Sequence, residues 1–277
     1  MSTGQRGVLA DLLALLDLEQ TGADEFRGQS SNAGAYRLFG GHVAAQSLAA
    51  AGRTVGADRD AATIQSTFLR AGRPDEPLSF TVDRLGDGRS FSFRRVLATQ
   101  RNKPIFSLLA TFHTGDEAPC HSTAFAPVDP ESLPDFAPQV WTMVLGAFEV
   151  RRAVGEPGTG RSTMALRTAG PMPADALLHA CVLAYASDLY ILDTPLSRHG
   201  IDGLDQGWDS ASIDHAVWFH HRPQVDEWLI YDLVSPIAND GRALIRGELH
   251  TESGTLVASV TQSAMFRHAI QPKQESA

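Results

Sequence analysis

Cysteine is scarce in this chain of 277 residues, which contains only two, Cys120 and Cys181. Neither belongs to a C-x-x-C pair or to the His/Cys spacing of a zinc site. Two isolated cysteines exclude a disulfide-stapled scaffold and fit a reducing compartment. We find no other cluster of metal ligands in the sequence, and we expect neither a metal ion nor a cofactor.

Basic residues are also few, with 23 Lys and Arg against 32 Asp and Glu and a net charge of -9. Sequence-independent binding of nucleic acid depends on Lys and Arg that neutralise phosphates. The acidic balance therefore excludes nucleic acid as a partner. Local groups of arginines can still contact a phosphorylated small molecule.

Long uninterrupted hydrophobic runs are missing near both ends of the chain. The apolar stripe of the first twenty residues is broken by Asp11 and Asp17, which neither a signal peptide nor a membrane span tolerates well. This stretch predicts an amphipathic helix that packs on the body of the protein. The last residues, PKQESA, carry no peroxisomal tripeptide, so we expect a cytoplasmic protein without membrane insertion.

Three common catalytic or phosphate-binding motifs are absent as well. The sequence has no G-x-S-x-G nucleophile elbow, no P-loop and no dinucleotide-binding fingerprint. These absences disfavour a Ser-His-Asp hydrolase and a nucleotide-dependent enzyme.

An internal repeat is present, with an offset of 149 residues. The sequences ATIQSTFLRAGRP (62–74) and ASIDHAVWFHHRP (211–223) begin and end alike, and each predicts a strand. Downstream, DEPLSFTVDRL resembles DEWLIYDLVSP, and each half continues into a hairpin with a turn near Asn102 or near Ser253-Gly254. Gene duplication explains this agreement in order and type of element.

Each repeat follows a predicted helix, FGGHVAAQSLAAAGRTV (39–55) or ADALLHACVLAYASDLYIL (174–192), the second with Asp175 in its first turn. A Pro-rich, polar stretch separates the halves and predicts a linker. We therefore predict an N-terminal repeat with its leading helix in residues 1–115, a linker in 116–140 and a C-terminal repeat in 141–277.

The order and wording of these segments resemble the acyl-CoA thioesterase II family. The segments that carry the resemblance are LFGGHVAAQSL, FLRAGRPDEPLSFTVDRLGDGRSFSFRRV, KPIF, SIDHAVWFH, DEWLIYDLVSP and GTLVASVTQSAMFR, within residues 11–267. The resemblance implies an α+β double hotdog, in which two fused repeats each wrap an antiparallel sheet around a long central helix.

Asp188 is an unusual residue for its position, because a carboxylate is seldom buried without partners. A continuous helix would place it on one stripe with apolar residues, namely Leu178, Cys181, Tyr185 and Leu192. Aligning the two helices at their entrances sets Leu48 opposite Asp188. The C-terminal repeat thus carries a carboxylate that the first repeat lacks, although a solvent-facing residue at a helix end is the simpler alternative.

The family resemblance implies partners for Asp188. Thioesterases of this type combine an Asp with a Thr or Ser and a Gln, which match Asp188, Ser212 and Gln262. Ser212 departs from the usual Thr, and it lacks the methyl group that restricts χ1. These three side chains would orient a water molecule, and one catalytic site per chain follows, in the C-terminal repeat.

Gly40 and Gly41 lie at the entrance of the first helix, where glycine allows close backbone approach. Free N–H groups at a helix N-terminus can stabilise a developing oxyanion. We therefore expect the backbone near Gly41 to polarise the thioester carbonyl while Asp188 orients water.

Other polar residues leave two interpretations open. Arg70, Arg73, His221 and Arg222, with the neighbouring His220, can contact the phosphates of coenzyme A or simply cover a solvated strand end. Asp214 and His215 are adjacent in a predicted strand and point to opposite faces, which excludes a simple dyad and favours structural roles.

The resemblance thus implies an enzyme of lipid metabolism that hydrolyses acyl-CoA to a free fatty acid and coenzyme A, and that forms a homo-oligomer, a dimer or tetramer. The alternatives are a non-catalytic acyl-CoA-binding or sensing protein and, less favoured, an enoyl-CoA hydratase. A hotdog hydratase uses an Asp/His pair at fixed spacing, whereas the nearest His after Asp188 in its helix-side segment is His199.

Overall fold

The computed structural model describes residues 3–30, 37–136, 146–154, 158–201 and 207–268, and in this part of the chain all strands form one antiparallel sheet of twelve. The helices are α1 (Thr3–Leu16), α2 (Gly40–Gly52), α3 (Ala176–Ala186) and α4 (Asp193–Ser197), with a 3-10 turn η1 (Pro130–Ser132). The strands are β1 (Glu19–Gln20), β2 (Glu25–Gly28), β3 (Asp60–Phe68), β4 (Leu78–Asp87), β5 (Phe91–Gln100), β6 (Lys103–His113), β7 (Phe148–Val154), β8 (Arg161–Thr168), β9 (Trp208–Phe219), β10 (Leu229–Asn239), β11 (Arg242–Thr251) and β12 (Leu256–His268).

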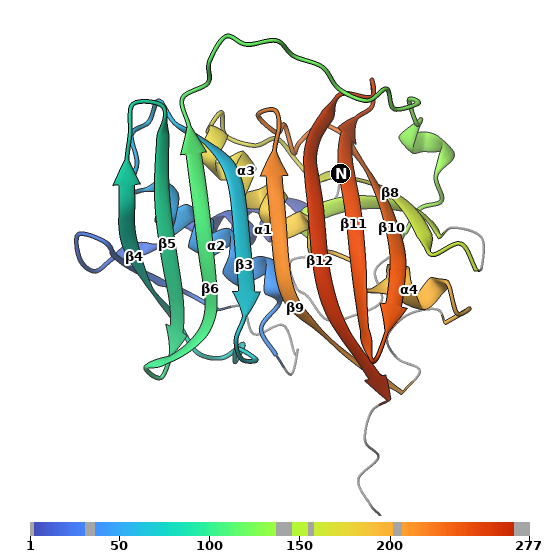
Figure 1. Ribbon diagram of the computed structural model, residues 1–277, viewed down its shortest axis with the longest axis horizontal. Coiled ribbons are helices and arrows are strands. Elements are labelled where there is room, and N and C mark those ends of the chain that lie inside the picture. The colour runs from blue at the N-terminus through green and yellow to red at the C-terminus, as the bar shows by residue number, and fades with distance from the viewer. Residues whose placement is uncertain (1–2, 31–36, 137–145, 155–157, 202–206, 269–277) are drawn as a thin grey trace, which may run out of the picture.

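The strand order reveals two equivalent halves that meet at the centre of the sheet (Figure 1). Outward from the centre, β3-β6-β5-β4-β2-β1 on one side corresponds to β9-β12-β11-β10-β8-β7 on the other. In the central β3–β9 pair, Ser66 lies directly opposite His215, which is its counterpart at the repeat offset of 149. This arrangement confirms the predicted α+β double hotdog.

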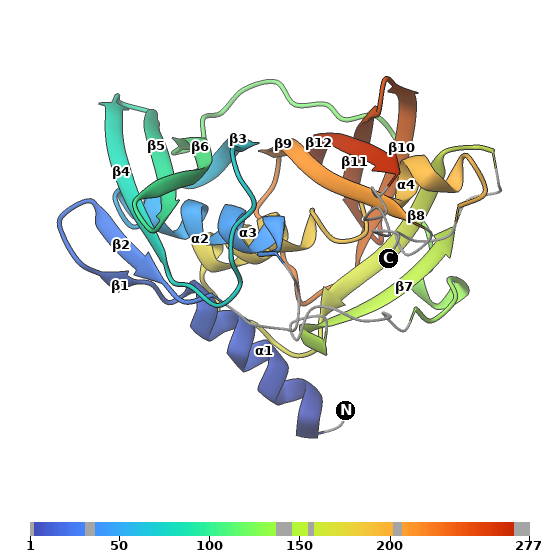
Figure 2. The same ribbon diagram turned by 90° about the horizontal axis from the view of Figure 1, so that it is seen from below.

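The two long central helices lie side by side in the hollow of the curved sheet (Figure 2). α2 is rich in alanine and buried from Gly41 to Ala51, and α3 is buried on all sides from His179 to Ala186. Small side chains on α2 let the helix axes come close, and a helix that is apolar all round belongs inside a core. The ends of these helices are therefore brought together inside the molecule.

α3 ends earlier than the sequence pattern predicts. Ser187 is its C-cap, so Asp188 lies in the following turn, and the predicted stripe through Leu192 is wrong. The helix alignment also shifts by one turn, because α2 and α3 begin 136 residues apart, at Gly40 and Ala176. The same offset makes Gly52, not Leu48, the counterpart of Asp188.

The packing at the helix ends supports this corrected alignment. A Cβ atom at Gly40 would lie 2.5 Å from Asp188 Oδ2, and one at Gly52 would lie 2.4 Å from a methyl carbon of Leu177. The two helices therefore make equivalent contacts at both ends. At one end of the helix pair Gly40 meets the Asp188 carboxylate, whereas at the other end Gly52 meets the apolar side chain of Leu177, in agreement with one carboxylate site per chain.

The predicted leading helix and hairpins are confirmed. α1 packs on the core through Leu9, Leu12 and Leu16. The β5–β6 turn passes through Arg101 and Asn102, both with positive φ, as a two-residue hairpin requires. The β11–β12 hairpin turns at residues 252–254, where Gly254 has φ +91.

The linker arches from β6 over the ends of the strands to the second half (Figure 1). Phe125 stacks on His250 with ring centroids 3.8 Å apart, and Val128 and Leu133 pack with Phe125 on a small cluster around Trp228. The linker thereby covers part of the outer face of the second half. Residues 137–140 of the predicted linker lie outside the described residues, and the exact domain boundaries stay a prediction.

Candidate active site

Asp188 is buried, with 7% of its surface exposed, in the turn that follows α3. Its Oδ2 accepts a hydrogen bond of 2.8 Å from the backbone N–H of Gly41 in the first turn of α2. The N-cap residue of α2, Phe39, makes no side-chain capping bond, and the first turn holds no acidic residue. Asp188 therefore caps a helix of the other repeat, and the positive end of that helix dipole stabilises its anionic form.

Gly40 and Gly41 permit this close approach because neither carries a side chain. A Cβ atom at Gly40 would lie 2.5 Å from Asp188 Oδ2 and 2.9 Å from the ring of Phe68. One at Gly41 would lie 2.4 Å from the carbonyl oxygen of Tyr185. The predicted close backbone approach is present, but its partner differs. The Gly41 N–H donates to Asp188, so the expected contact of the backbone near Gly41 with a substrate carbonyl falls to a neighbouring N–H group and stays a prediction.

Ser212 and Gln262 reach Asp188 from two neighbouring strands. The Ser212 hydroxyl lies 3.5 Å from Asp188 Oδ1, a long hydrogen bond, and Gln262 Nε2 donates to Ser212 Oγ at 2.9 Å. Gln262 is fully buried on the inner face of β12. The structure thus brings together the three side chains that the family resemblance implies.

A β-bulge in β9 aims Ser212 at this site. Ser212 pairs with Ala264 and Asp214 with Ser263, so Ile213 is an extra residue in the strand. In a regular strand Ser212 and His215 would point to opposite faces, because they are three residues apart and strand side chains alternate. The bulge absorbs Ile213, so both side chains reach the inner face, and bulges commonly redirect a side chain in this way.

His215 and Ser187 belong to the same network, which the sequence did not reveal. His215 is 1% exposed, its Nδ1 bonds to Gln262 Oε1, and its Nε2 lies 2.8 Å from Ser187 Oγ. Asp214 points the other way and accepts from the backbone of Ser263 at 2.9 Å. The exclusion of an Asp214–His215 dyad agrees with this geometry, but the preference for a merely structural His215 overlooked its contact with Gln262.

Burial sets the protonation of the site. It raises the pKa of Asp188, against the opposing effects of nearby His215, the Gln262 amide, the Gly41 N–H and the Ser212 hydroxyl. Burial also lowers the pKa of His215, so this imidazole is neutral at neutral pH. A carboxylate with a raised pKa next to a neutral imidazole provides a base that is stronger than an exposed aspartate.

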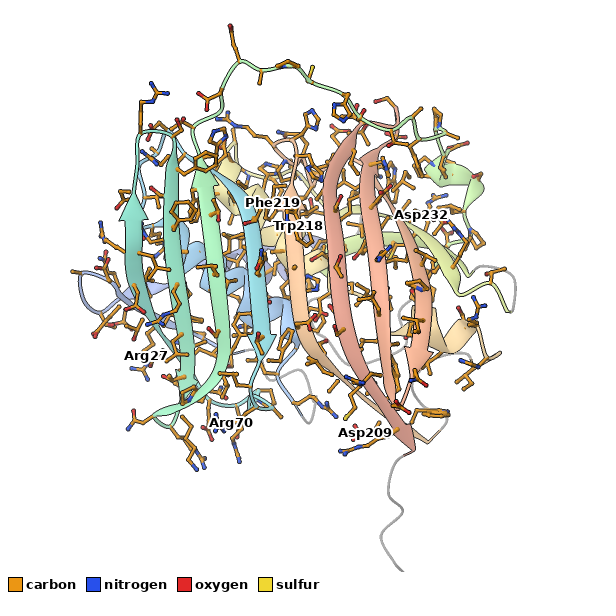
Figure 3. All side chains as sticks on the ribbon, viewed as in Figure 1. Arg27, Arg70, Asp209, Trp218, Phe219 and Asp232 are labelled. Carbon is orange, nitrogen blue, oxygen red and sulfur yellow. The ribbon has the colours of Figure 1, made fainter. Side chains whose placement is uncertain are left out.

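The four predicted cationic residues do not form one group, because β3 and β9 run antiparallel. Arg70 and Arg73 follow the end of β3, which lies beside the first half of β9, and Arg73 then bonds to Gln100 at the end of β5. His221 and Arg222 follow the far end of β9, roughly 20 Å away at 3.3 Å per residue. Figure 3 shows this separation, with Arg70 and Asp209 at one end and Phe219 toward the other.

Their contacts separate these residues further. Arg222 forms an ion pair of 2.9 Å with Asp60, and His221 bonds to a backbone carbonyl. His221 and Arg222 therefore do not form one cluster with Arg70 and Arg73, and their contact with coenzyme A stays a prediction. On the near side, Arg73 pairs with Glu76 at 2.7 Å, whereas the exposed Arg70 donates to the carbonyl of Pro104.

Comparison with known proteins yields matches along most of the chain. A family model described as acyl-CoA thioesterase matches residues 148–265, and one described as acyl-CoA thioesterase N-terminal domain matches residues 28–113. The chain is 31% identical to acyl-CoA thioesterase 2 of Haemophilus influenzae, over 94% of this chain and 98% of that protein.

Solved structures agree. The tesB protein of Mycobacterium avium subspecies paratuberculosis superposes with a TM-score of 0.83 at 34% identity, over 94% of this chain and 99% of the other. Acyl-CoA thioesterase II TesB2 of Mycobacterium marinum gives a TM-score of 0.82 at 36% identity, with the same coverage. In the described part of the chain, every helix is too short or too polar to cross a lipid bilayer.

Proposed function

The chain belongs to the acyl-CoA thioesterase family and is a thioester hydrolase, and we propose that it cleaves acyl-CoA to a free fatty acid and coenzyme A by direct attack of water. One observation carries the assignment of the site, namely the buried Asp188 carboxylate held between the N-terminus of α2 and the Ser212 hydroxyl. A thioester is already activated, so its hydrolysis needs a positioned water, a base and stabilisation of charge.

Asp188 is the proposed base. It accepts a proton from water as the water oxygen attacks the thioester carbonyl carbon, the carbon–sulfur bond breaks, and the proton passes to the departing thiolate. Ser212 and Gln262 hold the same water, and an amide can do so without competing for its proton. The raised pKa of Asp188 supports this role, because a base is most effective when its pKa approaches the working pH.

The N-terminus of α2 is the proposed site for the developing oxyanion. The Gly41 N–H is engaged by Asp188, which leaves the Gly40 N–H, one of the four that lack a partner within the helix. This group belongs to a rigid helix, as stabilisation of a transition state requires.

For coenzyme A, the cationic end of the site is the proposed phosphate contact. Arg70 is the stronger candidate, because it is exposed and its guanidinium bonds to a neutral carbonyl. Arg73 is weaker because its guanidinium already pairs with Glu76. Arginine suits phosphates because its planar group donates two parallel hydrogen bonds.

A thiol-release assay with acyl-CoAs from short to long chains tests the proposal. We expect turnover of at least one chain length, with free acid and coenzyme A formed in equal amounts. Tight binding of acyl-CoA without turnover at any length would contradict hydrolysis and favour a non-catalytic binding protein. Conversion of an enoyl-CoA to its 3-hydroxy product without thiol release would favour a hydratase.

Three further predictions from the sequence go beyond the family assignment. We propose a cytoplasmic location, a role in fatty acid metabolism and a homo-oligomer, a dimer or tetramer. The N-terminal repeat, linker and C-terminal repeat remain proposed at 1–115, 116–140 and 141–277.

A further inference from the structure

We infer that His215 is a positioning residue whose Nδ1–H turns the Gln262 amide so that its NH2 group faces Ser212 and Asp188. The inference rests on the proposed function, because it explains how the site presents a hydrogen-bond donor to the reacting atoms. The observation behind it is a continuous chain of contacts from the buried Ser187 through His215, Gln262 and the half-buried Ser212 to Asp188.

The direction of this chain depends on one proton. Gln262 Oε1 faces His215 Nδ1, and a carbonyl oxygen only accepts, so Nδ1 carries the proton. A neutral imidazole then has an unprotonated Nε2, which accepts from the Ser187 hydroxyl at 2.8 Å. Each donor therefore points along the chain toward the carboxylate, the only member that accepts from both Ser212 and the Gly41 N–H.

The same atoms can also form a complete hydrogen-bond network with all donors reversed. The position of the proton on His215 therefore decides which network the site adopts. With the proton on Nε2, His215 donates to Ser187, and Ser187 donates to the carbonyl of Ala184 at 3.0 Å. Gln262 then turns its carbonyl toward Ser212, and the Ser212 proton is used there and not on Asp188. The site would present an acceptor in the place where an oxyanion or water needs a donor.

Two buried hydroxyl groups hold the backbone of His215 and of Ser187, the first two members of this hydrogen-bond chain. Ser66 of β3 donates to the carbonyl of His215 at 2.6 Å, and Tyr231 of β10 donates to the carbonyl of Ser187 at 2.9 Å. Both partners sit in the core, so the imidazole and the Ser187 hydroxyl are fixed before substrate binds. An ionised Asp188 favours the direction in which every donor points to it.

The first test is the ring tautomer, measured by long-range ¹H–¹⁵N NMR on the free wild-type protein at neutral pH. We expect His215 to be neutral with the proton on Nδ1. A proton on Nε2, or a doubly protonated ring, would overturn the inference. This readout is independent of turnover, so it remains informative even if acyl-CoA hydrolysis is not observed.

The second test compares two substitutions. The amide nitrogen of Asn can occupy the place of Nδ1, so His215→Asn is expected to keep kcat within a few-fold of wild type, whereas His215→Leu lowers it about 10- to 100-fold with little change in KM. His179→Asn is the matched control, because His179 is also buried but bonds to the Val225 backbone outside the network. Equal kcat losses in the Asn and Leu variants, or no loss in either, would overturn the inference. If the Leu variant does not fold, the NMR measurement of the His215 tautomer tests the inference alone.

Discussion

Asp188→Asn is expected to lower kcat/KM for acyl-CoA hydrolysis by about 10²–10⁴-fold, the usual contribution of a general base. Asn keeps the size and one acceptor for the Gly41 N–H, but it cannot take a proton from water. The fold should survive, because Asn satisfies most of the same hydrogen bonds. Steady-state kinetics with the best acyl-CoA, together with circular dichroism, measures both effects.

Asp175→Asn is the matched control for this change. Asp175 caps the opposite end of α3 by accepting from the backbone N–H of Leu178 at 3.0 Å, and Asn caps helices equally well. The control should therefore retain wild-type turnover. Near-normal turnover of the Asp188→Asn protein would contradict the role of the Asp188 carboxylate as the base.

The same variant should change how stability depends on pH. Because burial raises the pKa of Asp188 in the folded state, the native protein holds this proton more tightly than the unfolded chain. As pH rises from the unfolded value, about 3.9, through the folded pKa, wild type loses stability that the Asn variant keeps. Denaturant titrations across this pH range should show the free energy of unfolding of the Asn variant rising relative to that of wild type as pH increases. A constant difference would contradict the raised pKa.

Gly41→Ala is expected to lower kcat about 100-fold, although Ala retains the backbone N–H. The new Cβ would lie 2.4 Å from the carbonyl oxygen of Tyr185, a backbone atom that only a shift of α2 against α3 can relieve. Such a shift pulls the N–H away from Asp188, and misplacement by about 1 Å can cost 100-fold in rate. Kinetics and a thermal melt separate the loss of activity from general unfolding.

Gly86→Ala provides the control for adding a methyl group. A Cβ at Gly86 has an ordinary contact of 3.9 Å with the Phe93 ring, so this variant should match wild type in turnover. If Gly41→Ala were as active as Gly86→Ala, the close contact of the two helix ends would be irrelevant to catalysis.

The sequence predicts the architecture well because duplication leaves a readable pattern. Strands β3 and β9 lie where 62–74 and 211–223 predict them, although they end at Phe68 and Phe219, and both central helices and the hairpin turns also appear in the structure. The helix end was harder to predict. Apolar periodicity continues past Ala186, whereas the chain turns at Ser187, since tertiary packing decides where such a helix stops.

The site was less predictable, because its geometry depends on contacts between distant segments. Asp188, Ser212 and Gln262 came from family resemblance, but the role of His215 depends on a bulge at Ile213 that no residue pattern announces. The partner of the Gly41 N–H lies 147 positions away, in the other repeat. The predicted group of Arg70, Arg73, His221 and Arg222 is split in the structure because β3 and β9 run antiparallel. Residue spacing does not reveal the direction of strands in the sheet.

Direct attack by water is tested by a single turnover in ¹⁸O-labelled water, with enzyme in excess over acyl-CoA. Mass spectrometry of the released acid and of the peptide containing Asp188 shows where the new oxygen enters. We expect one ¹⁸O atom in the acid and none in the peptide, because Asp188 takes a proton and forms no bond to the acyl group. An unlabelled acid with ¹⁸O in Asp188 would contradict it and make the carboxylate a nucleophile.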